Sequence, residues 1–248
     1  MIIAVSRGIA QRYGERIRAL DHRIALVWPE GERWSGDVQA AEAVYFSEDF
    51  WTSGESRTIL PQLFTLPNLR WFHSFSAGVG HIGGEVARLA KAFRMRVVGC
   101  RRRRRPVRNV DEFVPPERLH ELLAQAHFVV LALPLTLQTE GLIGESELRA
   151  MRQDAWLINI ARGQVVNEPA LVRALKDGSI GGACLDVFQE EPLPEESELW
   201  SLPNVIVTPH NSGRSPLNQE RGTEIFLDNL GRYVAGKPLR NRVRASDL

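Results

Sequence analysis

The stretch Ala155-Trp156-Leu157-Ile158-Asn159-Ile160-Ala161-Arg162-Gly163 is an apolar run that ends in a polar turn. The same pattern returns at residues 183–188, which lead to Glu191, and at residues 205–208, which lead to His210. Short apolar runs of this kind predict buried strands of a parallel sheet. The carboxyl ends of such strands share one edge, where ligands bind. We therefore expect the arginine, the glutamate and the histidine to converge in space.

These three residue types suit the reduction of a carbonyl that lies beside a carboxylate. The Arg162 guanidinium can hold a carboxylate through two parallel hydrogen bonds while it polarises the neighbouring carbonyl. Imidazole titrates near neutral pH, so His210 can protonate the oxygen as a hydride reaches the carbon. A nearby Glu191 carboxylate would favour the imidazolium and fix the ring tautomer. Each residue alone is more simply a surface charge or a loop residue, but three that each follow a strand favour a catalytic site.

Five ordered segments carry a resemblance to a known family. They are Gly78-Val79-Gly80-His81-Ile82-Gly83, Ala132-Leu133-Pro134-Leu135-Thr136, Ile158-Asn159-Ile160-Ala161-Arg162-Gly163, Leu185-Asp186-Val187-Phe188 with Glu191-Pro192, and Thr208-Pro209-His210-Asn211-Ser212-Gly213. From about residue 75 to its end, the chain resembles the D-isomer-specific 2-hydroxyacid dehydrogenases. The resemblance implies the catalytic roles just argued for Arg162, Glu191 and His210, with a 2-oxoacid such as glyoxylate or hydroxypyruvate as substrate. It also implies that Asp186 lies near the nicotinamide carboxamide.

Composition sets modest bounds on the class of protein. The chain has 248 residues, 44% of them hydrophobic, and a formal net charge of +1, so nothing global favours nucleic acid or an anionic membrane as a partner. The apolar run at the N-terminus is too short for a signal peptide, and we expect a cytoplasmic enzyme. Cys100 and Cys184 form neither a disulfide framework nor a metal-binding pattern, and we expect both in the core.

Strand-like and helical patterns alternate along the chain, which predicts an α/β fold with a doubly wound parallel sheet. We expect a truncated flavodoxin-like substrate domain at residues 1–77, a Rossmann-type dinucleotide-binding domain at 78–217, and a C-terminal helix and tail at 218–248 that return to the substrate domain. Further strands are expected at residues 2–6, 24–28, 43–46, 69–76, 96–100 and 128–133. Helices are expected at residues 9–20, 86–93, 119–126, 145–151, 168–176 and 218–234.

Gly78, Gly80 and Gly83 have the spacing of a dinucleotide-binding loop between a strand and a helix. Backbone amides there, including those of His81 and Ile82, could hold a pyrophosphate at the positive end of the helix. The simpler alternative is a turn of small residues. The resemblance adds that amides near Ala77 and Gly78 hold the substrate carboxylate together with Arg162.

The junction near Val79 is shorter than the family pattern. Residues 71–79 resemble the end of the substrate domain and residues 80–86 resemble the later nucleotide loop, so several tens of intervening residues are absent. The strand at 69–76 cannot complete the substrate sheet and also lead the nucleotide sheet. We therefore expect this internal deletion to impair catalysis. The alternatives are an inactive NAD(P)-binding protein or cofactor sensor, and a chain that folds only in part.

The strand at 96–100 ends where NAD users of the family carry an acidic residue. Here Arg101 and Arg102 begin a run of five arginines, whose guanidinium groups would attract a 2′-phosphate. We expect NADP rather than NAD as cofactor, although a solvated basic run is the simpler alternative. Pro134, Ala161 and Asp186 complete the expected cofactor contacts. By analogy with the family we expect a homodimer, a small 2-oxoacid or 2-hydroxyacid as the partner, and no metal.

Overall fold

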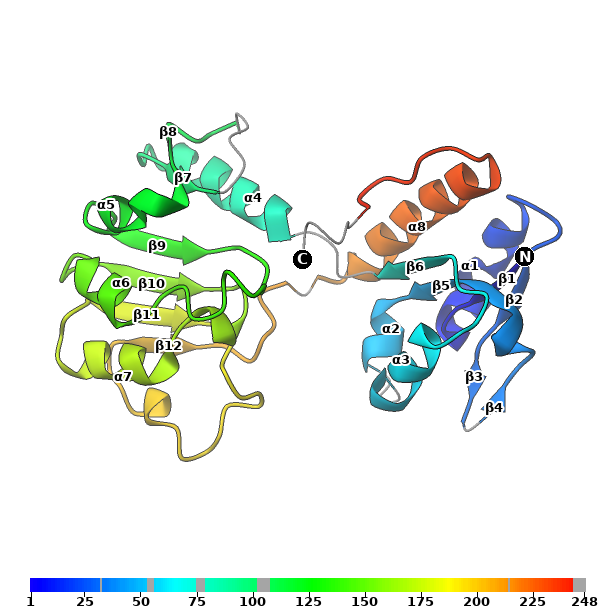
Figure 1. Cartoon of the computed structure of the whole chain (residues 1–248), viewed down its shortest axis with the longest axis horizontal. Coiled ribbons are helices and arrows are strands. Elements are labelled where there is room, and N and C mark those ends of the chain that lie inside the picture. Colours follow the sequence, from blue (N-terminus) through cyan, green and yellow to red (C-terminus); the bar gives the residue numbers. More distant parts are fainter. Residues whose placement is uncertain (32, 53–55, 75–78, 102–107, 214, 243–248) are drawn as a thin grey trace. The chain divides into compact units, whose positions relative to one another are not determined.

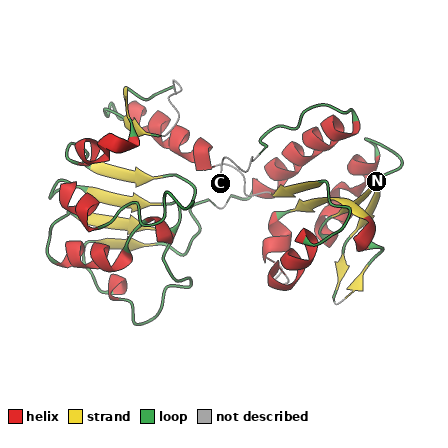
Figure 2. Ribbon diagram, viewed as in Figure 1, coloured by secondary structure: helices red, strands yellow, loops and turns green. Residues whose placement is uncertain are grey.

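The computed structural model describes residues 1–31, 33–52, 56–74, 79–101, 108–213 and 215–242. The chain divides into two compact units (Figures 1 and 2). Unit 1 consists of Met1–Ala77 and Arg214–Asp247, and unit 2 consists of Gly78–Gly213. Each unit is built on a parallel sheet with its own buried core, so the predicted α/β fold class is confirmed.

Unit 1 contains a four-stranded sheet in the order β2-β1-β5-β6, in which every pairing is parallel. This order is the beginning of the flavodoxin-like arrangement 2-1-3-4-5. The strands are β1 (Ile2–Ala4), β2 (Ala25–Val27), β5 (Ala41–Phe46) and β6 (Trp71–Ser74). The helices are α1 (Arg7–Arg18), α2 (Glu48–Thr52), α3 (Ser56–Phe64) and α8 (Asn218–Val234). A small hairpin of β3 (Pro29–Glu30) and β4 (Arg33–Trp34) and a 3₁₀ turn, η1 (Val38–Ala40), complete the unit.

Helix α8 supplies part of the unit 1 core although it lies far along the chain from the sheet. Phe226 and Leu230 of α8 are fully buried in one cluster with Ile3 of β1 and Tyr45 of β5. The Phe226 ring stacks on the Tyr45 ring at a centroid distance of 4.3 Å. The sheet of unit 1 is therefore covered on one side by a helix from the C-terminal part of the sequence.

Unit 2 contains a second parallel sheet in the order β12-β11-β10-β9. Its strands are β9 (Phe128–Leu131), β10 (Trp156–Asn159), β11 (Gly182–Leu185) and β12 (Val205–Val207). Its helices are α4 (Val79–Ala92), α5 (Leu119–Leu123), α6 (Glu145–Ala150) and α7 (Glu168–Lys176), with 3₁₀ turns η2 (Pro116–Arg118), η3 (Gly163–Val165) and η4 (Glu198–Trp200). A separate parallel pair joins β7 (Val98–Cys100) to β8 (Glu112–Val114).

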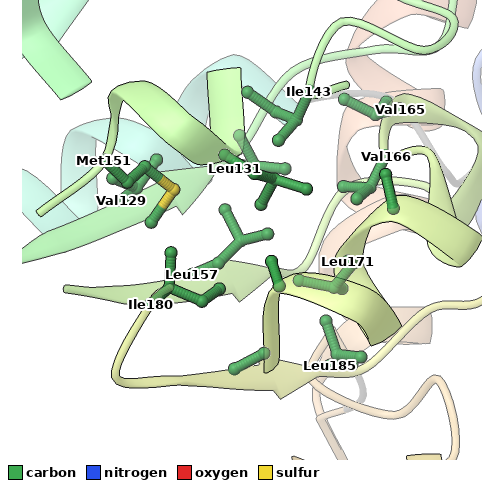
Figure 3. Close-up of a cluster of buried hydrophobic side chains, with 14 of the residues drawn as sticks. Val129, Leu131, Ile143, Met151, Leu157, Val165, Val166, Leu171, Ile180 and Leu185 are labelled. Carbon is green, nitrogen blue, oxygen red and sulfur yellow. The ribbon is translucent and has the colours of Figure 1, made fainter. Parts of the chain in front are cut away.

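The core of unit 2 lies between this sheet and the helices that follow its strands (Figure 3). Leu157 of β10 is fully buried and pairs in register with Val129 of β9 and Ala183 of β11. Helix α7 buries Leu171 on the same core, and it begins where the Asn167 side chain accepts a hydrogen bond from the Ala170 amide at 3.0 Å. These contacts fix the loops that leave the carboxyl ends of β10 and β11.

Strand β6 belongs to unit 1. It pairs with β5 in the register Ala43–Trp71 to Phe46–Ser74, so the strand expected at 69–76 completes the first sheet. In a doubly wound sheet of order 3-2-1-4, strand 1 lies between strands 2 and 4 and leads into the glycine-rich helix. Among the described residues no strand occupies that position beside β9, and β7 and β8 pair only with each other. Of the two places that the sequence left open for the strand at 69–76, the structure shows the one in the sheet of unit 1, and α4 is left without a described strand before it in the sheet of unit 2.

The expectation for the two cysteines is also answered. Cys100 is exposed and Cys184 is partly buried, so the expectation that both lie in the core is wrong. Cys100 is the last residue of β7, whose only described sheet neighbour is β8, and this leaves little around it to cover its side chain. Across the described ranges, no helix combines the length and the apolar character needed to span a membrane.

Candidate functional site

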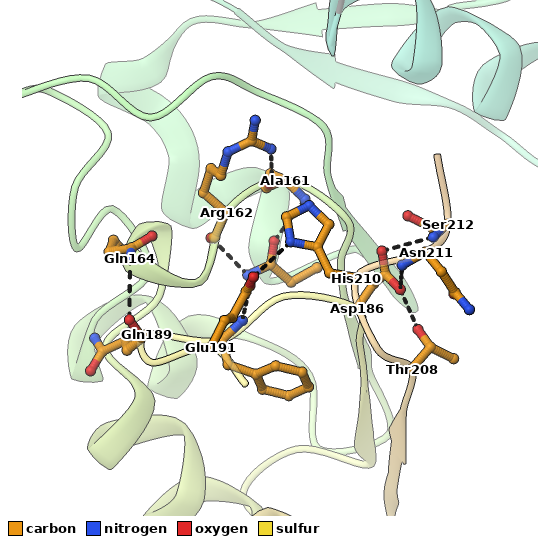
Figure 4. A network of polar contacts seen from close by, with 12 residues as sticks. Ala161, Arg162, Gln164, Asp186, Gln189, Glu191, Thr208, His210, Asn211 and Ser212 are labelled. Carbon is orange, nitrogen blue, oxygen red and sulfur yellow. Dashed lines mark hydrogen bonds and ion pairs between the residues drawn. The ribbon is translucent and has the colours of Figure 1, made fainter. Parts of the chain in front are cut away.

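The candidate site consists of three loops at the carboxyl ends of adjacent strands in unit 2 (Figure 4). Arg162 follows β10, Glu191 follows β11, and His210 follows β12. Since β10, β11 and β12 are neighbours in a parallel sheet, their loops emerge at one edge. All three side chains are exposed on unit 2, where a ligand can reach them.

A hydrogen bond joins Glu191 and His210. His210 Nδ1 lies 2.7 Å from Glu191 Oε2, and Glu191 Oε1 accepts a hydrogen bond from the Phe188 amide at 3.0 Å. The carboxylate is thus held by the backbone and orients the ring through Nδ1. In the described part of the chain Nε2 of His210 has no hydrogen-bond partner, so this nitrogen is available to a substrate.

Arg162 lies in a turn that buried contacts hold tightly. The buried Asn159 side chain accepts from the Ala161 amide and donates to the Arg162 carbonyl, both at 3.0 Å. The guanidinium donates from Nη1 to the Ala161 carbonyl at 2.6 Å and makes no ion pair with any described carboxylate. An arginine without a described acidic partner, at the same edge of the sheet as a histidine, suits an anionic substrate.

Gly163 joins the Arg162 turn to the loop that carries Glu191. A Cβ atom at this position would lie 1.9 Å from the backbone carbonyl carbon and oxygen of Phe188 and 2.4 Å from the Gln189 amide nitrogen. Because backbone atoms cannot give way as a flexible side chain can, only glycine fits here. Two of the three candidate catalytic residues are thereby placed in one rigid arrangement.

Asp186 lies directly after β11 and is 3% exposed. Its Oδ1 accepts hydrogen bonds from Thr208 Oγ1 at 2.5 Å and from the Asn211 amide at 3.0 Å, and its Oδ2 accepts from the Ser212 amide at 3.0 Å. Burial alone would raise the pKa of Asp186, but the hydrogen bonds from Ser212, Thr208 and Asn211 outweigh it and lower the pKa below the ordinary value.

The glycine-rich segment differs from the sequence prediction. Helix α4 begins at Val79, so Gly80, His81, Ile82 and Gly83 lie within its first turns and not in a loop before it. A Cβ on Gly83 would lie 3.6 Å from the Ala132 Cβ, an ordinary contact distance, so packing does not require glycine there. The amides of this first turn still point out of the helix and can bind an anion.

The other predicted site residues are dispersed, and some fall outside the described residues. Arg101 follows β7 directly, and its guanidinium lies 5.9 Å from the Phe113 ring centroid in a cation–π contact. Pro134 is exposed beyond β9, and Ala161 is fully buried in the Arg162 turn. Ala77, Gly78 and Arg102 lie outside the described residues. Among the described His, Cys, Asp and Glu residues, no group of three could hold a metal ion.

Sequence reasoning did not assign two residues that build the site. Asn159 and Gly163 stand within the quoted stretch, yet their roles depend on hydrogen bonds and on the close approach of the Phe188 backbone. Asn159 is a polar residue within an apolar run, and a polar side chain buried there must be hydrogen-bonded. This feature of the sequence could have indicated its role. No signal in the sequence pointed to the contact between Gly163 and Phe188.

A doubly wound α/β unit with polar side chains gathered at the carboxyl edge of its sheet defines a protein of the dinucleotide-binding class. The family model described as "D-isomer specific 2-hydroxyacid dehydrogenase, NAD binding domain" matches residues 76–212, more than half of the chain. The chain belongs to this family, as the resemblance in its sequence indicated.

Individual relatives agree with this assignment. A glyoxylate reductase of Thermococcus gammatolerans is 47% identical over 163 residues, which cover 64% of this chain and 48% of the relative. An NADPH-dependent glyoxylate/hydroxypyruvate reductase of Sinorhizobium meliloti has a similar structure, with a TM-score of 0.53, 30% identity, and coverage of 66% of this chain and 87% of that one. The chain spans about half the length of the curated relatives it matches.

A more distant solved structure has the same fold over nearly the whole chain. It is a D-isomer specific 2-hydroxyacid dehydrogenase from Xanthobacter autotrophicus in complex with NADPH and MES. Its TM-score is 0.73 at 23% identity, with coverage of 98% of this chain and 97% of that one. The likeness therefore extends to unit 1, and at this identity it concerns the fold alone.

Proposed function

We propose that the chain is an NAD(P)H-dependent reductase of small 2-oxoacids, with Arg162, Glu191 and His210 as its catalytic residues. The observation that carries the proposal is the Glu191–His210 pair at 2.7 Å, with Nε2 of His210 open to a ligand. Arg162, which follows the neighbouring strand and forms no ion pair with a described carboxylate, supports the choice of an anionic substrate. Relatives described as glyoxylate reductases support a small 2-oxoacid in particular.

Each residue has a defined part in the reaction. The Arg162 guanidinium binds the substrate carboxylate and polarises the neighbouring carbonyl. The amides of the first turn of α4 and Arg101 would hold the dinucleotide, which would provide the hydride for the carbonyl carbon. His210 gives the Nε2 proton to the carbonyl oxygen and is protonated again from solvent, so the product is the 2-hydroxyacid. Glu191 stabilises the imidazolium before transfer and keeps the ring in its orientation.

The residues present fit a nicotinamide dinucleotide in part. The first-turn amides of α4 are suited to a pyrophosphate, and Arg101 at the end of β7 is suited to a 2′-phosphate. We therefore infer NADP as the preferred cofactor, with NAD as the alternative. The description of the Sinorhizobium meliloti reductase as NADPH-dependent supports this preference.

A second candidate function is cofactor binding without turnover, as in an inactive dinucleotide-binding protein or sensor. It is favoured by the pairing of β6 with β5, which leaves α4 without a preceding strand of the unit 2 sheet among the described residues. A pyrophosphate held by a helix that its sheet does not support is less precisely positioned. We accordingly expect turnover below that of a relative with the complete junction.

The first experiment is calorimetric titration of the purified chain with NADPH and with NADH. Saturable binding that favours NADPH is expected, and an Arg101→Gln variant should lose that preference. Equal affinity for the two nicotinamides would contradict the assignment of Arg101. Binding of neither, by a chain that melts cooperatively, would contradict both candidate functions.

Turnover is then measured with glyoxylate and with hydroxypyruvate. Replacing the general acid in His210→Gln should lower kcat by about 100-fold to 10,000-fold while NADPH affinity is kept. Arg162→Gln should raise KM for the oxoacid, and Arg173→Gln, an exposed arginine on α7, is the matched control. Full turnover by His210→Gln would overturn the assignment, whereas NADPH binding with no turnover by the wild type would favour the second function.

The proposal extends to a cytoplasmic location and to a homodimer, both of which follow from the analogy with the family. The oligomeric state is measured by sedimentation of the purified chain across a range of concentrations. A monomer at all concentrations would contradict the dimer without affecting the catalytic assignment.

A further inference from the structure

Asp186 is connected to the segment that carries His210 on both sides of the histidine. We call residues 208–212 the His210 segment. Asp186 accepts from Thr208 before the histidine and from Asn211 and Ser212 after it, at distances between 2.5 and 3.0 Å. The backbone on both sides is tied in as well, since the Thr208 amide donates to the Leu185 carbonyl and the Asp186 amide donates to the Asn159 carbonyl. One buried carboxylate therefore closes the segment into a loop.

His210 needs such support because its backbone is strained. Its φ is 49°, in the left-handed region that a residue with a Cβ adopts only at a cost of about 1 kcal/mol or more. Within the segment, the His210 amide donates to the Thr208 carbonyl at 3.1 Å. Hydrogen bonds to a carboxylate are charge-assisted and stronger than neutral ones, so the three bonds to Asp186 can offset the strain.

The carboxylate of Asp186 has little capacity left for another partner. An ionised carboxylate offers about four acceptor sites, and three are used by the His210 segment. No described lysine, arginine or histidine forms an ion pair with Asp186, so its charge is balanced by the donors of this segment. Figure 4 shows the carboxylate enclosed by Thr208, Asn211 and Ser212.

We propose that Asp186 is a positioning residue, which holds the His210 segment in its left-handed turn so that the imidazole meets both Glu191 and the substrate. This role is additional to the carboxamide contact that the resemblance implied. The proposal rests on the proposed function for its catalytic consequence, but the geometric part stands apart from it. If the segment loosens, His210 loses its place beside Glu191 even though both residues are present.

The test is hydrogen exchange of the Asn211 and Ser212 amides in the full-length chain, measured by NMR for the wild type and for Asp186→Asn. An asparagine keeps the size of the side chain but turns one acceptor into a donor that faces a backbone N–H or the Thr208 hydroxyl. We expect exchange of these two amides to accelerate by about tenfold or more. Asp154→Asn makes the same chemical change at an exposed turn before β10 and should leave their exchange unchanged.

Cofactor affinity and turnover separate the two roles of Asp186. Faster exchange with an NADPH dissociation constant within about twofold of wild type supports the positioning role, and kcat should then fall by about 100-fold. Unchanged exchange overturns the proposal, and tenfold weaker NADPH binding with unchanged exchange assigns Asp186 to the cofactor. If the wild type shows no turnover, the proposed function fails, while the exchange result still decides the role of Asp186.

A second variant covers the case in which Asp186→Asn does not fold. Thr208→Val removes only the hydroxyl that donates to Oδ1 and leaves the carboxylate in place. Its Asn211 and Ser212 amides should exchange faster than in the wild type, by a smaller factor than in Asp186→Asn. Wild-type exchange rates at both amides in Thr208→Val would overturn the proposal.

Discussion

Because Gly163 has no side chain, the Arg162 turn can pack directly against the loop that carries Glu191. The Arg162 turn approaches the Phe188 backbone so closely that any Cβ at position 163 would overlap it. Gly163→Ala should therefore destabilise unit 2 by about 1 to 3 kcal/mol, because the turn or the Glu191 loop must move. The measurement is urea unfolding of the purified variant and the wild type.

Gly84 provides the matched control for this substitution. It lies within α4, where a Cβ would meet nothing within 4 Å, so Gly84→Ala should stabilise the helix by about 0.5 to 1 kcal/mol. Equal effects of the two alanines on unfolding would contradict the argument from the Phe188 contact.

The sequence predicted the three candidate catalytic residues but not the hydrogen bonds that position them. Arg162, Glu191 and His210 could be proposed because strand ends of a parallel sheet share an edge, and a motif indicates the residue types. The bonds of Asp186 could not be foreseen, since they depend on the left-handed turn at His210 and on which donors it aims at the carboxylate. Sequence spacing does not encode such angles.

Among the elements, β6 carries a titratable group whose surroundings predict a pH effect. His73 packs edge-on against Tyr45, Trp71 and Phe226, and burial lowers the pKa of His73 to about 4. In the unfolded chain a histidine titrates near pH 6.5, so between about pH 6.5 and 4 the unfolded state binds a proton that the folded state does not. Unit 1 should accordingly lose stability as the pH falls through this window.

The measurement is the free energy of unfolding at a series of pH values, followed by tryptophan fluorescence. His73→Phe should flatten the pH dependence between about pH 6.5 and 4, because the ring no longer titrates. His22→Gln is the control, since this histidine is 93% exposed and its replacement should leave the slope unchanged. A His73→Phe slope identical to that of the wild type would contradict the assignment.

Exposed apolar side chains lie on α4, directly after it and at the start of β9. Leu89 is 50% exposed and Phe93 is 80% exposed, and Phe128 at the start of β9 is 56% exposed. Apolar side chains that no described part of the chain covers favour self-association. The double variant Leu89→Lys/Phe93→Lys should therefore remain dispersed at concentrations where the wild type associates, as measured by light scattering.

Ala92→Lys serves as the control for added charge. It places a lysine on an exposed position in the last turn of α4 and leaves both apolar side chains in place. If this variant suppressed association as strongly as the double variant does, net charge and not apolar exposure would be the cause.

The elements also mark where sequence prediction succeeds. Helices α7 and α8 begin and end at the residues expected from their apolar spacing, because the local periodicity indicates a helix, and α7 is also capped by the Asn167 side chain. The sequence did not decide which of the two sheets β6 joins, because the strand could have paired with a strand of either sheet. Strand pairing depends on segments that are far apart in the sequence, and the apolar pattern within one strand does not specify its partner.

For the whole molecule, separate cores predict separable unfolding. The buried cluster of unit 2 includes Leu157, and the clusters of unit 1 include Ile17, each with no exposed area. Truncating either to alanine should cost about 2 to 5 kcal/mol in its own unit. Calorimetry should show Ile17→Ala lowering the transition of unit 1 and Leu157→Ala lowering that of unit 2. A single transition that both variants lower equally would contradict this expectation.

The discontinuity of unit 1 has a consequence for the order in which the chain can fold on the ribosome. Unit 2 is continuous in sequence, so its sheet can form as soon as β12 has left the exit tunnel. Unit 1 must wait, because its sheet stays uncovered until α8 delivers Phe226 and Leu230. The strands of unit 1 that are translated before unit 2 therefore fold after it, and during that interval their apolar side chains are exposed to aggregation.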